Sequence, residues 1–401
     1  MLDFEAALSR AVAPPEAAEA IAAACAADGF DIEEIGRSAA DKGTPVPGLL
    51  AALRAKLPAE AAANLHRGAT SQDVVDTAAM LVAKRALGPL LEDLGAAADA
   101  CAALAERHQG APMAGRTLLQ QAAPVTFGLK AAGWLAGLDD ARTELTDVRA
   151  HGLAVQLGGA VGTLAALGED GLSAVASVAR SLELAEPALP WHTVRTRPAR
   201  LACALGVAAG VMGKIARDVE LMAQTEVGEV VEGGEGRGGS STLPHKRNPV
   251  GAVAVSACAA RVPGLVATML ASMAQEHERA AGAWQAESET LSDLLRLTGS
   301  AAAALRELLE GLEVDADRMR ANLDITDGLL MTESVVTALT PSLGRTKAQE
   351  LVEDAARRVL HEGVSLREAL PDIDEQALAP ESYLGAANEL IDRALSAHRS
   401  T

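Results

Sequence analysis

Residues 239–249 read GSSTLPHKRNP, and the chemistry of this stretch organises the interpretation of the whole chain. It ends a run in which five of the seven residues from Gly233 to Gly239 are glycine. Glycine adopts both signs of φ at little steric cost, so the run predicts a loop that can open and close over a ligand. The pair Asn248-Pro249 predicts a helix N-cap and first helical residue, with free N–H groups facing the same place. Hydroxyl groups, an ammonium group and a helix start together suit a bound carboxylate beside a carbon acid that is being deprotonated.

The composition predicts long helices. Of the 401 residues, 49% are hydrophobic but only 2% are aromatic, and alanine dominates. Because alanine has the highest helix propensity, we expect a nearly all-α protein. Long helices with alanine-rich seams bury modest area within one chain, so we also expect an oligomer.

The net charge, the first five residues and the most apolar span argue against a nucleic-acid partner, a signal peptide and a membrane span. A net charge of −19 argues against nucleic acid and against an anionic membrane surface. Residues 1–5 include the acids Asp3 and Glu5, where a signal peptide needs basic residues. The most apolar span, residues 251–274, is interrupted by Arg261 and Pro263, so we do not expect it to cross a membrane.

The four cysteines are far apart and have no metal-ligand spacing. We interpret them as buried thiols of a protein in the reducing cytoplasm, and we expect no metal site. They are Cys25, Cys101, Cys203 and Cys258.

Residues 66–73, HRGATSQD, predict the start of a helix. Thr70 and Asp73 have the spacing of a capping box, and apolar residues at helical spacing follow them. Thr70 and Ser71 would then lie at the end of the helix that attracts anions. Taken alone, the pattern is more often a simple cap, and a lone histidine such as His66 before a turn is usually a surface residue.

Four further segments allow predictions of their local structure or role. Residues 111–120, APMAGRTLLQ, should open another helix after a turn. Residues 156–163 are rich in glycine but lack the strand and spacing of a dinucleotide site, so no cofactor is expected. Residues 191–197 place His192 and Arg195 before a new helix, where an exposed basic turn is an equal alternative. Residues 275–284 are expected in a long helix, as a solvated or inter-subunit face.

The segment GSSTLPHKRNP resembles the loop motif GSSxxPxKxN of the fumarase/aspartase superfamily at every defined position. Residues 66–73 and 111–120 resemble its segments HxGxTSxD and GRTHxQ, in the same order along the chain. The resemblance implies Ser240, Lys246 and His66 as catalytic residues, with Ser240 as the base. It implies the substrate-binding residues Thr70, Ser71, Arg116, Thr117, Gln120, His192, Arg195, Ser241 and Asn248, no cofactor and no metal.

Two substitutions indicate which branch of the superfamily the chain resembles. Leu118 stands where the lyases carry a histidine, and Val253 stands where they carry the glutamate that pairs with it. A leaving carboxylate has a conjugate acid of pKa about 4 and departs without being protonated, whereas hydroxide or an amine needs a general acid. Both losses together suggest chemistry that does not use the pair.

The amino acids at residues 68–78, 114–138, 190–195 and 238–253 most resemble those of the 3-carboxy-cis,cis-muconate cycloisomerase family, which forms a lactone in protocatechuate breakdown. This resemblance implies a small anionic tricarboxylate substrate, with His66, His192, Arg116 and Arg195 as candidate ligands of its carboxylates. The alternative is a lyase that releases fumarate from a substituted succinate, of the adenylosuccinate or nitrosuccinate type, since nitrite is also a weak base. A structural protein without activity is a third reading, which the intact Ser240 motif argues against.

The resemblance also implies an architecture. We expect the three-domain fumarase/aspartase-type fold, all-α, with a central bundle of long helices that forms a 20-helix core in a homotetramer. The expected domains are residues 1–69, residues 70–317 with the catalytic loop 233–248, and residues 318–401. Each active site would draw the Thr70, Arg116 and Ser240 segments from different subunits.

Overall fold

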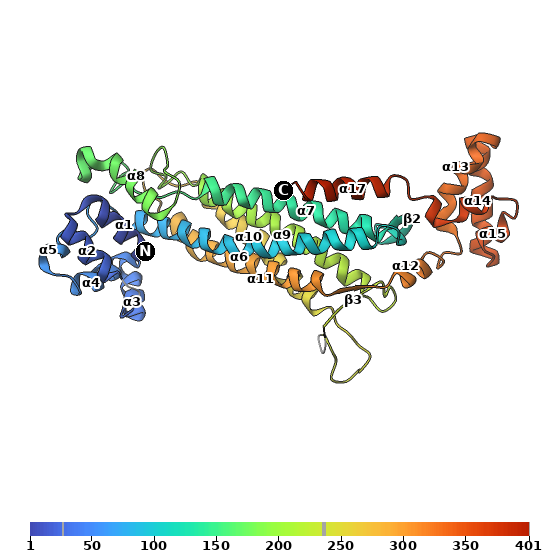
Figure 1. The fold of residues 1–401 in the computed structure, drawn as a ribbon, viewed down its shortest axis with the longest axis horizontal. Helices are drawn as coiled ribbons and strands as arrows, with labels where there is room; N and C mark the ends of the chain where they lie inside the picture. Colours follow the sequence, from blue (N-terminus) through green and yellow to red (C-terminus); the bar gives the residue numbers. More distant parts are fainter. Residues whose placement is uncertain (26–27, 235–237, 401) are drawn as a thin grey trace. The chain divides into compact units, whose positions relative to one another are not determined.

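The computed structural model describes residues 1–25, 28–234 and 238–400 (Figure 1). The part of the glycine-rich run from Glu235 to Arg237 lies outside them. The long helices are α6 (Ser71–Arg107), α7 (Phe127–Asp147), α9 (Thr196–Met222), α10 (Val250–Ala271) and α11 (Ala283–Glu310). The shorter helices are α1 (Leu2–Val12), α2 (Pro15–Ala24), α3 (Ile32–Lys42), α4 (Val46–Ala55), α5 (Ala59–Ala62), α8 (Gly171–Leu182), α12 (Ala316–Asn322), α13 (Thr332–Leu343), α14 (Arg345–Glu362), α15 (Leu366–Ala369), α16 (Glu375–Leu378) and α17 (Ala387–His398).

Strands and other helical turns are few in the described ranges. The strands β1 (Pro112–Thr117) and β2 (Gln120–Thr126) pair antiparallel, as do β3 (Val230–Glu232) and β4 (Leu312–Val314). One π-helical turn spans Val148–Gly152, and three 3₁₀ turns span Ala165–Asp170, Leu329–Met331 and Pro380–Ser382. The expectation of a largely helical protein is therefore confirmed.

The chain divides into two compact units, each of which combines three stretches of sequence. Unit 1 consists of Met1–Leu91, Thr143–Ala209 and Ala260–Gly299, and unit 2 consists of Glu92–Arg142, Gly210–Ala259 and Ser300–Thr401. Each of the five long helices contributes residues to both units. The division into three domains stays a prediction.

Small side chains fill the seams of the long helices. Along α6, Ala97, Ala98 and Ala105 are fully buried, and Trp134 on α7 is one of the few large aromatic residues in the core. Alanine lets helix backbones approach closely, but each contact removes little apolar area from water. This agrees with what the low aromatic content predicts.

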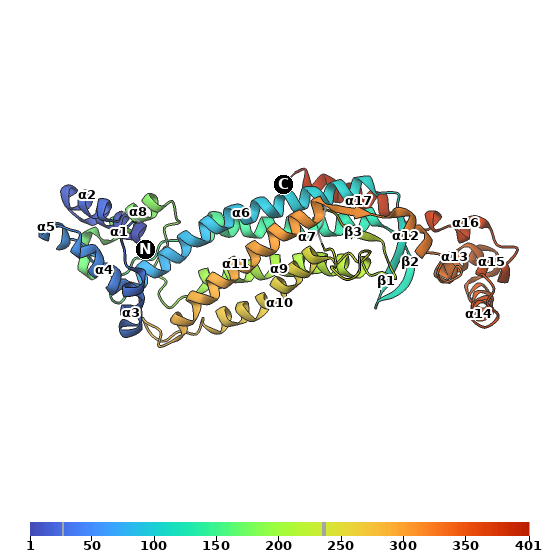
Figure 2. The ribbon, with the colours of Figure 1, turned by 90° about the horizontal axis from the view of Figure 1, so that it is seen from below.

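The structure overturns one local expectation, because residues 111–120 form a β-hairpin and not the start of a helix. Thr117 pairs with Gln120, so Leu118 and Leu119 make a two-residue turn. Both have positive φ, +50° and +66°, as the tight turn of a twisted hairpin requires. A Cβ on Gly115 would lie 2.6 Å from the carbonyl oxygen of Ala123, so the hairpin needs glycine there. Within unit 2 the hairpin packs against α12 (Figure 2).

Two helices, α9 and α10, are long and apolar enough to cross a membrane by length and composition alone. Most of the apolar window of α9 is buried inside the protein, whereas only 22% of that of α10 is. Val253 and Leu270 are among the exposed apolar side chains of α10. This helix thus presents an apolar face that the described part of the chain leaves largely uncovered.

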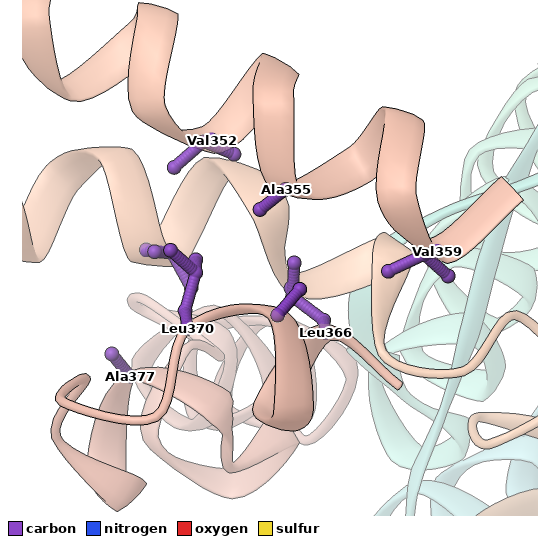
Figure 3. Close-up of a cluster of buried hydrophobic side chains, with 8 residues drawn as sticks. Val352, Ala355, Val359, Leu366, Leu370 and Ala377 are labelled. Carbon is purple, nitrogen blue, oxygen red and sulfur yellow. The ribbon is translucent and has the colours of Figure 1, made fainter. Parts of the chain in front are cut away.

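The carboxyl-terminal part of unit 2 has a small core of its own (Figure 3). Val352, Ala355 and Val359 line one face of α14 and pack with Leu366 and Leu370. Their spacing of three and four residues is that of a helix with one apolar stripe. None of the predicted site residues belongs to this cluster.

Candidate active site

In unit 1, the helix start predicted at residues 66–73 is confirmed. Helix α6 begins at Ser71, and the backbone N–H of Thr70 donates to Oδ2 of Asp73 at 3.0 Å. The carboxylate of Asp73 therefore caps the turn that carries Thr70 and Ser71, as one half of a capping box does. Thr70 and Ser71 are half-buried.

Asp73 also joins this turn to two distant segments. It is fully buried, and it accepts hydrogen bonds from the N–H groups of Gly158 and Gly159 at 3.1 and 3.0 Å. Nε2 of His192 lies 2.6 Å from Oδ1 of Asp73. A buried carboxylate with this many donors is well satisfied, so Asp73 fixes His192 relative to Thr70.

The glycines of residues 156–163 serve this close packing. A Cβ on Gly158 would lie 2.8 Å from Cε1 of His192. Gly159 has φ +70°, and a Cβ there would lie 2.9 Å from the carbonyl oxygen of Gly68. Only glycine fits at such approaches. The glycine-rich segment thus has a packing reason that does not involve a dinucleotide.

Arg195 lies in a buried ion network and not in an exposed basic turn. It is 4% exposed, its Nη1 lies 2.8 Å from Oδ2 of Asp76, and its Nε lies 3.0 Å from Oε1 of Glu287. Burial alone would lower the pKa of Arg195, but the charge of Asp76 and the hydrogen bonds of both carboxylates raise it above its ordinary value. Burial raises the pKa of Glu287 in spite of the opposing effect of Arg195. Direct contact of Arg195 with a substrate stays a prediction.

Arg279 in unit 1 contacts the segments that carry Thr70 and Gly159, which the sequence did not indicate. Its guanidinium donates to Oε1 of Gln72 at 3.0 Å and to the carbonyl oxygen of Gly159 at 2.9 Å. It lies in the connection between α10 and α11, where we had expected a continuous helix. No local pattern marks Arg279, because its partners are far away in sequence.

A hollow of about 700 Å³ in unit 1 lies beside the ion network. Residues of α6 and α11 and the segment 39–45 line it, together with Arg195. His66, Thr70, Ser71 and His192 do not line this hollow. The hollow therefore coincides with the predicted site only at Arg195.

In unit 2, Arg116 is held by a buried carboxylate. Its Nη1 and Nη2 lie 2.9 and 2.6 Å from the two oxygens of Glu229, which is fully buried. Asn322 donates to the same carboxylate at 2.9 Å. This bidentate pair fixes the guanidinium plane on the β-hairpin. Thr117 and Gln120 are exposed at the end of that hairpin, where Leu118 is 97% exposed.

The loop of residues 238–249 forms a narrow stem with an exposed tip. Gly239 bridges Arg247, and both the N–H and the side-chain amide of Asn248 donate to the carbonyl oxygen of Gly238, at 2.8 and 3.0 Å. The hydroxyl oxygen of Ser240 accepts hydrogen bonds from the N–H groups of Thr242 and Leu243 at 3.3 and 3.2 Å. Two donors aimed at one oxygen would stabilise negative charge on it.

The prediction that Asn248 caps a helix whose N–H groups are free is wrong. Helix α10 begins at Val250, and the Asn248 side chain donates to the loop instead. The N–H groups of Gly251 and Ala252 donate to the two oxygens of Glu232 at 2.9 and 2.8 Å. Glu232 is buried at the end of β3 and is a far better acceptor than an amide. The helix dipole therefore already meets a carboxylate from the protein.

The predicted residues are divided between the two compact units. Unit 1 holds His66, Thr70, Ser71, His192 and Arg195, and unit 2 holds Arg116, Thr117, Gln120, Ser240, Ser241, Lys246 and Asn248. Lys246 and Ser241 are exposed on the loop. Among the described residues, no group of three or more His, Cys, Asp or Glu side chains could hold a metal ion.

Five long helices contribute to both units, and the loop of residues 238–249 carries the serine turn at Ser240. The sequence model of the lyase family matches residues 5–264, well over half of the chain, and the chain belongs to this family. It is an enzyme with the fumarase/aspartase-type fold.

Particular relatives are similar over nearly the whole length. A 3-carboxy-cis,cis-muconate cycloisomerase from Bradyrhizobium diazoefficiens is 48% identical over 98% of this chain and 92% of its own. A nitrosuccinate lyase from Streptomyces davaonensis is 44% identical over 98% of this chain and 89% of its own. The crystal structure of the 3-carboxy-cis,cis-muconate lactonizing enzyme from Pseudomonas putida matches with a TM-score of 0.94 at 42% identity, covering 100% of this chain and 93% of that one.

Proposed function

We propose that this enzyme is a cycloisomerase that converts 3-carboxy-cis,cis-muconate to 4-carboxymuconolactone in protocatechuate (β-ketoadipate) catabolism in the cytoplasm. The observation that carries the proposal is the serine turn at Ser240, in a chain 48% identical over nearly its whole length to a relative of that name. This reaction needs a residue that transfers a proton to carbon, which is the role given to Ser240. It needs no general acid at position 118, because the oxygen that attacks or leaves is a carboxylate.

The reaction joins a carboxylate oxygen of the substrate to a carbon of a conjugated double bond. The electron pair of that double bond moves toward a neighbouring carboxylate, which becomes a more strongly charged aci-carboxylate. Ser240 then gives its proton to the carbon next to that group and regains one from solvent. One proton is therefore taken up for each lactone formed.

Ser240 can act in this way because the protein stabilises its conjugate base. The N–H groups of Thr242 and Leu243 point at its oxygen, and hydrogen bonds to a charged form favour that form. We assign the ammonium group of Lys246 and the hydroxyl of Ser241 to the aci-carboxylate. The helix start of α10 gives less help than the sequence suggested, because Glu232 occupies it.

The remaining carboxylates of the tricarboxylate substrate need cations and donors. We assign them to His66, Thr70 and Ser71 on one segment and to Arg116, Thr117 and Gln120 on the hairpin. Asn248 supports the stem of the loop, and His192 and Arg195 complete the set, with Asp73 and Asp76 fixing their positions. We infer a homotetramer in which these segments come from different subunits.

The proposal is tested with purified protein and 3-carboxy-cis,cis-muconate. We expect loss of the ultraviolet diene band and, in deuterium oxide, one deuterium on a product carbon. Ser240→Ala should lower kcat by about 10³-fold while KM changes little, since Ser240 acts in proton transfer. An unchanged diene band with fumarate formed from nitrosuccinate would instead assign the activity of the 44% identical relative.

A further inference from the structure

His66 forms a pair with a buried carboxylate from the first helix. Its Nδ1 lies 2.7 Å from Oε1 of Glu5, which lies on α1 and is 1% exposed. The other oxygen of that carboxylate, Oε2, is buried and has no hydrogen-bond partner among the described residues. A buried carboxylate that is only half satisfied is costly, so the pair requires an explanation beyond packing.

The backbone of His66 is also unusual. It has φ +61°, in the left-handed region that residues other than glycine seldom adopt. Gly68 follows with φ +75°, where a Cβ would collide with the side chain of Leu167. Costly conformations of this kind persist where the surroundings hold them, and they gather at functional sites. This turn leads directly into Thr70 and Ser71.

The contact with Glu5 decides which ring nitrogen is left for a ligand. A carboxylate only accepts hydrogen bonds, so Nδ1 donates to Glu5 and Nε2 is the ring nitrogen left for a ligand. No hydrogen bond joins Nε2 to any residue that the structure describes. The side chain of His66 is 14% exposed, so Nε2 lies in a sheltered position.

We propose that Glu5 is a positioning residue of the active site. It holds Nδ1–H of His66 and so fixes the ring with Nε2 toward the Thr70–Ser71 helix start. When the substrate binds there, Nε2 takes a proton from solvent and donates it in a hydrogen bond to the substrate carboxylate, while Glu5 balances the positive charge of the ring. The inference rests on the proposed function, because it takes His66 to touch the substrate. It gives the enzyme a histidine–carboxylate pair in unit 1, although Leu118 and Val253 are apolar.

The first test is a double-mutant cycle with Glu5→Gln and His66→Asn. We expect each single substitution to lower kcat/KM by about tenfold or more, and the double variant to be no worse than His66→Asn alone. Formate should restore part of the activity of Glu5→Ala by entering the space left by the carboxylate. Losses that multiply in the double variant would overturn the proposal, since Glu5 would then act independently of His66.

Asp3→Asn is the matched control on the same helix. Asp3 pairs with Arg85 at 2.7 Å on the surface of unit 1, so its loss should leave kcat/KM unchanged. If Asp3→Asn lowers kcat/KM as much as Glu5→Gln does, the effect comes from loosening α1, and the proposal fails.

A second readout needs no substrate. In protein labelled with ¹⁵N-histidine, the His66 ring should show the tautomer with the proton on Nδ1, and Glu5→Gln should convert it to a mixture. A ring that is the same in both proteins would refute the role of Glu5. If the spectrum changes as expected but the parent protein leaves 3-carboxymuconate intact, the proposed substrate is wrong and the positioning role stands.

Discussion

At the scale of single residues, Arg116 illustrates how much the site depends on a partner distant in sequence. Glu229, 113 residues away, holds both ends of its guanidinium group. We predict that Glu229→Gln lowers the free energy of unfolding by about 3 kcal/mol, because the buried end of Arg116 loses its counter-charge. We also expect a higher KM, since the guanidinium is no longer held in one plane. Denaturant unfolding and steady-state kinetics measure the two effects.

Glu381→Gln is the matched control for Glu229→Gln. Glu381 pairs with Arg320 at 3.0 Å, but both side chains are largely exposed. Water screens such a pair, so its loss should change the unfolding free energy by less than about 0.5 kcal/mol. Equal effects of the two substitutions would contradict a special role for Glu229.

Cys25 offers a chemical probe of the charge on Glu5. Burial raises the pKa of the Cys25 thiol to about 11, and the negative charge of Glu5 adds to the shift. Removing that charge in Glu5→Gln should lower the pKa, although burial keeps it above its ordinary value. Since the thiolate is the reactive form, alkylation of Cys25 at pH 9 should be faster in Glu5→Gln. Peptide mass spectrometry follows the rate, with Cys258 of unit 2 as the internal control, and an unchanged rate would contradict the prediction.

The residues that could be predicted from the sequence are those whose chemistry is written locally. Ser240, Lys246 and Asn248 stand within one short motif, and Thr70 and Asp73 have the spacing of a cap. The contacts between segments follow no local spacing. Asp73 and His192, for example, are 119 residues apart and meet only in the folded chain. A single sequence does not predict such pairs.

At the scale of elements, helix α10 begins on a carboxylate supplied by strand β3. Glu232 accepts the N–H groups of Gly251 and Ala252, so it joins the strand that enters the catalytic loop to the helix that leaves it. We predict that Glu232→Ala destabilises the protein by about 1–2 kcal/mol, through loss of the cap and of the charge at the helix start. Amide exchange at Gly251 and Ala252 should accelerate, and kcat should fall because the loop loses its anchor.

Asp315→Ala is the control for this cap. Asp315 caps the start of α12 in the same unit, where its side chain accepts the N–H of Arg318 at 2.8 Å. Its loss should cost a similar free energy without changing exchange at Gly251 or kcat. Loss of kcat in Asp315→Ala would show that general destabilisation, and not the loop anchor, controls the activity.

The elements that were misread from the sequence share one physical cause. Residues 111–120 contain good helix formers, but the pairing with residues 120–126 brings Gly115 close to the Ala123 carbonyl and gives Leu118 and Leu119 positive φ. Asn248-Pro249 has the composition of a helix start, but the N–H of Gly251 donates to the buried carboxylate of Glu232 on β3. In both cases a contact from outside the segment outweighed local propensity.

At the scale of the whole molecule, α10 exposes apolar side chains along its length. Leu270, at 46% exposure, is one of them. If α10 packs in the core of a tetramer, Leu270→Glu would bury an unpaired charge there, so we predict dissociation and loss of activity. Analytical ultracentrifugation measures the mass. Leu360→Glu is the control, because Leu360 is 69% exposed on α14 and should tolerate the charge. A Leu270→Glu protein of unchanged mass would contradict this use of α10.

Sharing of the site between subunits makes a further prediction. Thr70 belongs to unit 1 and Ser240 to unit 2, and we infer that one active site takes them from different chains. Thr70→Ala and Ser240→Ala should each be inactive alone. When the two chains are co-expressed and mix at random, roughly a quarter of the sites should receive an intact segment from both, so about a quarter of the parent activity should return. If each site instead took both segments from a single chain, every site would carry one defect and no activity would return. Separately purified variants that are mixed without exchange of subunits provide the baseline for this measurement.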